Sequence, residues 1–372
     1  MVAGEASGDL LAGLLLDGMR ARWPDMVCNG IGGMQMQRRG FDAWWPSDRL
    51  AVRGYVEVLR HYRDIVQIRD RLRARLLDQR PDIFIGIDAP DFNLGLERDL
   101  KQSGVHTVQF VCPSVWAWRA ERLARMRASV DHVLCLFPFE PELLRRHGIA
   151  ATYVGHPLAG VIPMQVDQAS ARAALGLRVD DSVLAILPGS RSSEIQYLAR
   201  RFLDAAALVK RAHPGIRLLL PAVPALASTI RALVHELGMD RDVQVLDGQS
   251  HLVLAACDVT LIASGTATLE AALYKRPMVI AYNMHWLSWQ IMRRKRLQSW
   301  VGLPNILCRD FVVPELLQDQ ASPVALALEI ENWLAAPERI AALQQRFTTL
   351  HRELLRDTPT LATDALEKIL AS

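Results

Sequence analysis

Two stretches in the second half of the chain, residues 183–194 and 259–270, carry residue types that can bind a phosphate group. Each stretch has an apolar run of strand composition, then a glycine with small neighbours, then the start of a helical pattern. Unpaired backbone N–H groups and the positive end of the helix dipole meet at such a turn, so it favours an anion such as a diphosphate. Two of these turns in one sheet predict a nucleotide pocket.

Two charged side chains strengthen this interpretation. Arg191 is a fixed cation beside the first glycine turn, and Glu270, one helical turn beyond the second glycine, can accept hydrogen bonds from two vicinal ribose hydroxyls. Neither stretch is a Walker loop or a Gly-x-Gly-x-x-Gly fingerprint. The alternative is that each glycine only reverses the chain at low steric cost.

Acidic side chains follow two apolar runs in the first half of the chain. Glu5, Ser7 and Asp9 lie where residues 2–9 pass through glycines into a helical pattern, and each offers a hydrogen bond. Ser7 or Asp9 could equally be a helix cap.

The apolar run 83–87 ends in two carboxylates, Asp88 and Asp91. An aspartate at the carboxyl end of a parallel strand points toward the ligand edge of the sheet, where partial burial can raise its pKa toward that of a general base. The alternative is that Asp88 caps the next turn and Asp91 is solvated.

The segment Pro113-Ser114-Val115-Trp116-Ala117-Trp118-Arg119 places two tryptophans on either side of one alanine. Their alternation predicts either a core stripe or a wall for a large apolar ligand, with Arg119 free to meet an anion. His156 fits a structural histidine better than a base. The pair Asp240 and Asp242 matches a metal-binding pattern by letter, but it stands in a polar stretch before a strand and is interpreted as a surface turn, so no metal is expected.

A short segment combines tryptophans, aliphatic residues and four consecutive cations. An amphipathic helix of this composition could rest on an anionic bilayer, although a charge run can also be a solvated helix face. The residues expected at the membrane surface are Trp286, Trp289, Arg293, Arg294, Lys295 and Arg296. The sequence has no run of about 20 apolar residues, so we predict no membrane span.

Length and composition set the remaining limits. The 372 residues suit two domains, and the net charge of +3 argues against broad nucleic-acid binding. Five scattered cysteines without a Cys-x-x-Cys pair predict a reduced, cytoplasmic protein. The oligomeric state is not fixed by the residues, and a homo-oligomer is compatible with them.

Strand-like runs alternate with helical patterns along most of the chain, which predicts an α/β fold of parallel sheets covered by helices on both faces. Prolines and glycines at 155–163 mark a domain boundary. We expect domains at 1–160 and 161–345, a helical tail at 346–372 that packs back on the first domain, and a wholly helical chain after Pro314. The active site is expected in a cleft between the domains. The predicted strands are 27–31, 83–87, 107–111, 132–136, 152–154, 183–187, 217–220, 243–246, 259–262 and 278–281.

Together these motifs resemble one family, the lipid-A-disaccharide synthases, over nearly the whole chain. The likeness rests on Val2-Ala3-Gly4-Glu5-Ala6-Ser7-Gly8-Asp9, Gly86-Ile87-Asp88-Ala89-Pro90-Asp91-Phe92-Asn93, Pro113-Ser114-Val115-Trp116-Ala117-Trp118-Arg119, Leu187-Pro188-Gly189-Ser190-Arg191, Ser264-Gly265-Thr266-Ala267-Thr268-Leu269-Glu270 and Leu303-Pro304-Asn305. Family members usually carry several more residues before Val2. Either the true start lies upstream of Met1, or the first strand is unusually short.

The resemblance implies a GT-B fold of two Rossmann-like domains and an inverting glycosyl transfer without metal or cofactor. The implied donor is UDP-2,3-diacylglucosamine, and the acceptor is 2,3-diacylglucosamine 1-phosphate, lipid X. A β-1,6-linked disaccharide 1-phosphate and UDP are the products, and the enzyme associates with the cytoplasmic face of the inner membrane.

The resemblance also implies residue roles. Ser190, Arg191, Gly265 and Thr266 are implied to hold the diphosphate of the donor, Glu270 its ribose and the backbone near Leu246 its uracil. Glu194 belongs to the same donor set, and Asn305 lines the donor pocket. Asp88 is the implied general base. The acceptor set comprises Glu5, Ser7, Asp9, Asp91, Trp116 and Arg119.

Two other functions compete with this interpretation. One keeps the fold and the UDP-sugar but makes the protein a sugar epimerase or a transferase to a different lipid. The other is a nucleotide-sugar or lipid-binding protein without catalysis. An epimerase has no need for a tryptophan-rich basic surface, and in a binding protein Asp88 is dispensable.

Overall fold

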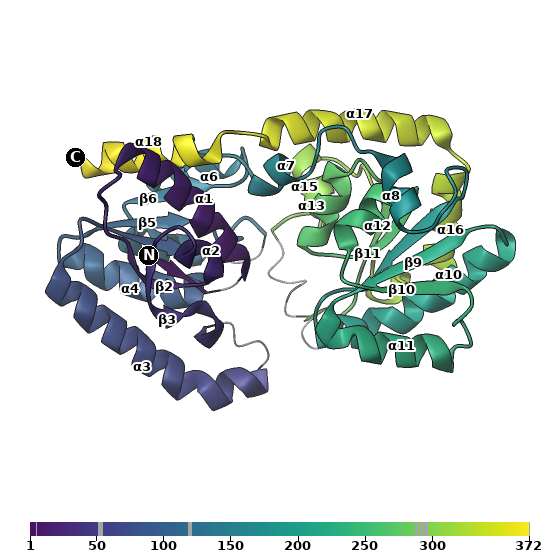
Figure 1. Cartoon of the computed structure of the whole chain (residues 1–372), viewed down its shortest axis with the longest axis horizontal. Helices are drawn as coiled ribbons and strands as arrows, with labels where there is room; N and C mark the ends of the chain where they lie inside the picture. Colours follow the sequence, from purple (N-terminus) through teal and green to yellow (C-terminus); the bar gives the residue numbers. More distant parts are fainter. Residues whose placement is uncertain are drawn as a thin grey trace. The chain divides into compact units, whose positions relative to one another are not determined.

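The computed structural model describes residues 1–4, 6–50, 55–117, 121–286, 289–290, 292 and 297–371. Its contacts divide the chain into two compact units. Unit 1 comprises residues 1–157 and 353–372, and unit 2 comprises residues 158–352. Each unit holds one parallel sheet between layers of helices, so the predicted α/β architecture is confirmed (Figure 1).

Unit 1 contains a seven-stranded sheet in the order β3-β2-β1-β4-β5-β6-β7. Its strands are β1 (Val2–Ala3), β2 (Asn29–Gly32), β3 (Asp42–Pro46), β4 (Ile83–Ile87), β5 (His106–Phe110), β6 (His132–Cys135) and β7 (Ala150–Tyr153). Its helices are α1 (Ala6–Arg22), α2 (Met34–Gln37), α3 (Tyr55–Gln79), α4 (Pro90–Gln102), α5 (Arg122–Ser129), α6 (Glu140–Arg145) and α18 (Thr358–Leu370).

Alternation along the strands divides the core of unit 1 into two layers. Ile85, Ile87 and Phe110 face α1 and α18, which lie side by side (Figure 1). Phe84 faces the opposite layer, where α3 and α4 cover the sheet with leucines such as Leu100. Because α18 comes from the end of the chain, the two termini of the sequence share one core.

Unit 2 contains a six-stranded sheet in the order β10-β9-β8-β11-β12-β13. Its strands are β8 (Val183–Leu187), β9 (Arg217–Ala222), β10 (Val243–Asp247), β11 (Val259–Ala263), β12 (Met278–Tyr282) and β13 (Glu315–Leu317). Its helices are α7 (Pro157–Val161), α8 (Gln168–Ala174), α9 (Ser192–Glu194), α10 (Arg200–Ala212), α11 (Ala227–Glu236), α12 (Ser250–Ala256), α13 (Thr266–Leu273), α15 (Leu303–Cys308), α16 (Pro323–Leu334) and α17 (Pro337–Leu354), of which α7 and α17 also include residues of unit 1.

The central strands of unit 2 are buried along their whole length, as expected for a parallel sheet covered on both faces. Helix starts follow local rules. Ser322 caps α16 by accepting from the Ala325 N–H at 3.3 Å, and Asp357 caps α18 by accepting from the Thr360 N–H at 3.2 Å.

The prediction that the chain is wholly helical after Pro314 is wrong. Residues 315–317 form β13, which pairs in parallel with β12 in the register Ala281↔Leu316. The strand has only three residues, and its first side chain, Glu315, accepts hydrogen bonds from the N–H groups of Val301 and Gly302 at 2.9 Å each. An edge strand so short and partly polar carries no periodic signal.

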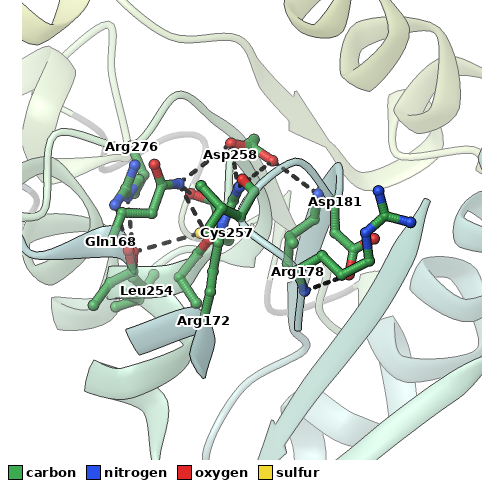
Figure 2. Close-up of polar contacts among 12 residues, drawn as sticks. Gln168, Arg172, Arg178, Asp181, Leu254, Cys257, Asp258 and Arg276 are labelled. Carbon is green, nitrogen blue, oxygen red and sulfur yellow. Dashed lines mark hydrogen bonds and ion pairs between the residues drawn. The ribbon is translucent and has the colours of Figure 1, made fainter. Parts of the chain in front are cut away.

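At the amino ends of β8 and β11, a polar cluster closes the sheet of unit 2 (Figure 2). Arg172 is buried, with both Asp258 carboxylate oxygens 2.8 Å from its Nη2, and its Nε donates to the Ala256 carbonyl at 3.0 Å. Gln168 donates to the carbonyls of Ala256 and Cys257. These bonds fasten α8 to the strand that leads into the second glycine turn.

Candidate active site

A cavity of about 450 Å³ lies at the carboxyl ends of β8, β9 and β11 in unit 2. Both glycine turns singled out in the sequence contribute to its wall, because parallel strands end at the same edge of a sheet. Leu187, Pro221 and Ala263 form the strand ends. The predicted donor residues in its lining are Ser190, Arg191, Glu194, Gly265, Thr266 and Glu270.

The second glycine turn presents unoccupied backbone donors. The N–H groups of Gly265, Thr266 and Ala267 have no hydrogen-bond acceptor among the described residues, and all three residues line the cavity. The next donor, the Thr268 N–H, is 3.1 Å from the Gly265 carbonyl, which also accepts from the Thr268 hydroxyl at 2.7 Å. The start of α13 therefore offers an anion site of the expected kind.

At the first glycine turn the expectation of open amides is wrong. The Glu194 carboxylate accepts from the backbone N–H groups of Ser190 and Arg191, at 2.8 and 3.2 Å, and from the Arg191 guanidinium at 2.9 Å. Gly189 makes this possible, because its φ of 125° disfavours other residues and a Cβ there would collide with Glu194. Arg191 nevertheless keeps 66% of its side chain exposed, whereas Glu194 keeps 15%.

Glu270 has a partner that sequence reasoning missed. The His251 Nε2 lies 3.3 Å from the Glu270 carboxylate, and the His251 ring packs edge-on against Tyr274. The hydrogen bond with Glu270 raises the pKa of His251. The available signal was Asp247-Gly248, a third strand-to-glycine step that precedes Ser250 and His251 at the start of α12.

In unit 1 the candidate base stands on an unusual turn. Asp88 follows β4 and is half-buried, and both Asp88 and Ala89 are left-handed, with φ of 54° and 41°. The turn after β1 packs against it, since a Cβ on Gly4 would lie 3.1 Å from the Ala89 Cβ. Two motifs far apart in the sequence thus meet at one edge of this sheet.

Comparison with known proteins decides the family. A model of the lipid-A-disaccharide synthetase family matches residues 1–369. A lipid-A-disaccharide synthase of Albidiferax ferrireducens is 66% identical, with 100% of this chain and 96% of that protein covered. A lipid-A-disaccharide synthase of Bordetella pertussis is 50% identical, with 99% and 97% covered. This chain belongs to the lipid-A-disaccharide synthase family.

Membership of this family makes the protein a glycosyltransferase of lipid A biosynthesis, with a UDP-sugar and a lipid as its substrates. Solved structures support the GT-B fold. A glycosyltransferase from Rickettsia africae superposes with a TM-score of 0.60 at 12% identity, covering 99% of this chain and 96% of that chain.

Other residues predicted for the synthase site lie in structural contacts. Asp9 is buried and caps α2, because its carboxylate accepts from the N–H groups of Gly33, Gln35 and Met36 at 2.8–3.1 Å. Trp116 is also buried.

Around Trp116 the contacts are aromatic and acidic. Its indole N–H donates to the Glu140 carboxylate at 3.0 Å, and its ring packs edge-on against Phe137 and Phe139. Burial raises the pKa of Glu140 to about 8. Trp116 therefore belongs to the core of unit 1.

Two predicted acceptor residues, Ser7 and Asp91, are exposed in the first turns of α1 and α4. Asp91 pairs with Arg122, with an oxygen 2.6 Å from a guanidinium nitrogen. Glu5 and Arg119 lie outside the described residues.

Two predicted donor residues, Leu246 and Asn305, do not line the cavity. Leu246 pairs with the lining residue Pro221 across β10 and β9, so it lies beside the cavity. Asn305 is buried, and its amide bonds the backbone at Val312 and Val313 and the Glu315 carboxylate. These bonds fix the approach to β13.

Three further features lie away from these residues. A cavity of about 440 Å³ in unit 1 lies at the amino ends of β2 and β4, the opposite end from Asp88. Asp240 and Asp242 are exposed in the turn before β10. None of the described helices is long and apolar enough to span a bilayer.

The predicted membrane segment lies only partly among the described residues. Trp286 is exposed and Trp289 half-buried, whereas Arg293, Arg294, Lys295 and Arg296 lie outside the described residues.

Proposed function

We propose that the protein transfers 2,3-diacylglucosamine from its UDP donor to the 6-hydroxyl of 2,3-diacylglucosamine 1-phosphate by a single inverting displacement without a metal. The acceptor oxygen attacks the anomeric carbon while the bond to the diphosphate breaks. The hydroxyl proton passes to a carboxylate, and the bonding electrons leave with UDP. The reaction therefore needs one anion site for the leaving group and one base for the acceptor.

The cavity of unit 2 supports the leaving-group role. The free N–H groups at the start of α13 face the same cavity as the exposed Arg191 guanidinium, so both can neutralise charge on the departing diphosphate. Glu270 is assigned to the ribose hydroxyls, with His251 holding its carboxylate. The backbone at Leu246 is assigned to the uracil.

Asp88 is assigned as the base. Its place at the carboxyl end of β4, next to the turn after β1, puts a half-buried carboxylate at the ligand edge of the sheet. Ser7, Asp91, Glu5 and Arg119 are assigned to the acceptor, and the buried contacts of Asp9 and Trp116 shape their surroundings.

One observation carries the proposal: the open amides of residues 265–267, Arg191 and Glu270 line a single cavity. The test is incubation of the protein with UDP-2,3-diacylglucosamine and lipid X, followed by mass spectrometry. Disaccharide 1-phosphate with one UDP released per product is expected. Release of UDP without disaccharide, or an epimerised sugar, would contradict it.

The base assignment has its own test. Asp88→Asn should lower kcat on the order of 10²–10⁴-fold, the usual contribution of general base catalysis, and leave the Kd for UDP unchanged. Asp82→Asn is the matched control, because this exposed carboxylate lies just before β4, at the opposite end of the strand from Asp88. Full turnover in Asp88→Asn would remove Asp88 as the base.

We also propose contact with the cytoplasmic membrane surface through the segment 286–296, on the strength of exposed Trp286 and the cations that follow it. Replacing Arg293, Arg294, Lys295 and Arg296 with serine should reduce sedimentation with anionic vesicles, most strongly at low salt. Unchanged binding to these vesicles would mean that the run is only a solvated face.

A further inference from the structure

A buried polar cluster lies behind the Asp88 turn. It consists of Glu97 and Asn93 on α4 and Gln109 on β5, all with no exposed surface. Four of its atoms have no hydrogen-bond partner among the described residues: both Glu97 carboxyl oxygens, Asn93 Oδ1 and Gln109 Oε1. Buried polar atoms are nearly always paired, so such a group calls for an explanation.

Gly86 creates the space for this cluster. A Cβ on Gly86 would collide with Glu97 Oε1 and would lie 2.9 Å from the Asn93 Cβ. Gly86 is the register partner of Gln109, so the side chain of Gln109 leaves the sheet on the same face, beside the same space. The three polar side chains therefore converge where the strand lacks a side chain.

The amide groups of the cluster hold the candidate base. Asn93 Nδ2 and Gln109 Nε2 donate to the Asp88 carbonyl at 2.9 and 3.0 Å. The Asp88 N–H donates to the Phe110 carbonyl at 2.9 Å. Left-handed backbone at two consecutive residues other than glycine is sparsely populated and persists only when its surroundings fix it.

A proton on Glu97 accounts for two of the four unpaired atoms, because one O–H group joins one Glu97 oxygen to one amide oxygen. All four atoms are oxygens that can accept hydrogen bonds. The amides are oriented this way because their nitrogens donate to the Asp88 carbonyl. A protonated carboxyl supplies the missing donor, whereas an ionised one would place a charge among acceptors. Burial raises the pKa of Glu97 to about 8, opposed only in part by Arg125 on α5.

Among the described residues, the other elements packed against α4 add no neutralising charge to Glu97. β4 and β5 face it with Gly86 and Gln109. α3 packs on α4 through Leu72 and Leu76, and its Arg73 pairs with Asp99, 2.7 Å away.

We propose that Glu97 is a positioning residue for the transferase. As a neutral carboxylic acid it donates to the Asn93 or the Gln109 amide oxygen and so fixes one of the two amides that hold the strained Asp88 turn. The proposal rests on Asp88 being the base, and it deepens that assignment. Glu97 itself touches no substrate.

The test compares Glu97→Gln with Glu97→Leu. Glutamine keeps a neutral donor, so kcat should stay within about threefold of the unsubstituted enzyme, whereas leucine should lower kcat about 30-fold or more with KM and the Kd for UDP unchanged. As pH rises through 8, the kcat of the unsubstituted enzyme should fall as Glu97 ionises, and Glu97→Gln should lack that limb. Normal kcat in Glu97→Leu, or the same alkaline limb in Glu97→Gln, would overturn the proposal.

A control separates positioning from general loss of stability. Leu100→Ala, three residues beyond Glu97 on the same helix, removes an apolar side chain from the same buried layer and leaves Glu97, Asn93 and Gln109 unsubstituted. Hydrogen exchange of the peptide 86–93 should speed up in Glu97→Leu more than in Leu100→Ala at matched stability. Equal exchange in the two variants would reduce Glu97 to a packing residue.

The same exchange measurement distinguishes the two proposals. If Asp88→Asn is fully active while Glu97→Leu loosens residues 86–93, the base assignment fails and the positioning of the turn stands. If Asp88→Asn is inactive while Glu97→Leu leaves both exchange and kcat unchanged, the base stands and the role of Glu97 fails.

Discussion

The two ends of the sheet in unit 2 use the same residue types for opposite purposes. At the amino ends of β8 and β11, Arg172 is 5% exposed, and the carboxylate of Asp258 and nearby carbonyls accept its hydrogen bonds (Figure 2). At the carboxyl ends, Arg191 also pairs with a carboxylate, Glu194, but its side chain is 66% exposed at the wall of a cavity.

The difference shows how an arginine becomes structural or available for a ligand. At the amino end, the Asp258 carboxylate also accepts from the Val183 N–H at 2.8 Å. Arg172 and Asp258 therefore both use their hydrogen bonds on other groups of the protein. At the carboxyl end, the backbone donors of residues 265–267 remain open beside Arg191. Open backbone donors favour the binding of an anion at this end of the sheet.

The largest expected effect is a loss of stability at the amino ends of β8 and β11, where Arg172 is buried. Arg172→Ala leaves Asp258 and several carbonyls without their partner, so the free energy of unfolding should fall by about 3 kcal/mol. Chemical denaturation measures it. Arg178→Ala is the control, because its pair with Asp180 is exposed and should not matter measurably. Equal denaturation midpoints for Arg172→Ala and Arg178→Ala would show that the buried pair of Arg172 is not structural.

At the open end the effect should appear in binding. Arg191→Ala should raise the Kd for UDP about tenfold, since a hydrogen bond to a charged group contributes about 1.5 kcal/mol, and should leave the unfolding midpoint unchanged. Isothermal titration calorimetry and denaturation on the same samples check both. An unchanged Kd would count against Arg191 as a diphosphate ligand.

Glu194 also lies at the carboxyl ends of the strands, and its carboxylate accepts the hydrogen bonds of the first glycine turn's amides. Glu194→Gln removes a negative charge next to the diphosphate site and keeps an acceptor for the turn, so UDP should bind about fivefold more tightly. Titration at two salt concentrations measures the change. Weaker binding would show that the carboxylate orders the turn for UDP instead of competing with it.

The smallest effect concerns His251. Its pKa is raised in the folded protein, so the pair with Glu270 stabilises fully below the unfolded value of 6.5 and is lost as pH rises through the folded pKa. The loss should be well under about 1 kcal/mol, because the imidazole is partly exposed. Melting of His251→Gln at pH 6 and 8 should lack this decrease, and His235→Gln is a control at the opposite end of the sheet. A decrease of the same size in His251→Gln would exclude the pair as its cause.

Much of the fold follows from the sequence, with errors at the sheet edges. The runs predicted at 83–87 and 183–187 match β4 and β8 residue for residue. Of the strands absent from that prediction, β3 and β13 are edge strands with half-exposed residues, and β1 has only two residues. An interior strand is buried on both faces and therefore apolar throughout, whereas an edge strand depends on a neighbour that the local sequence does not specify.

The site shows a similar division. Glycine turns after strands were visible as patterns, and family motifs pointed to Asp88. Glu97 gave no signal, since it is one glutamate in a helix that also has exposed charges such as Arg98. The contacts of Asp9 could not be predicted either, because only the folded chain brings the amides of α2 to its carboxylate.

The sequence by itself determined the family, the alternating α/β elements and the two glycine turns, because these depend on residue type and spacing over a few positions. Only the tertiary structure decided which glycine turn keeps unpaired amides, which arginine is buried and which carboxyl group lies buried behind Asp88. The physical reason is that hydrogen-bond partners and burial are supplied by segments distant along the chain.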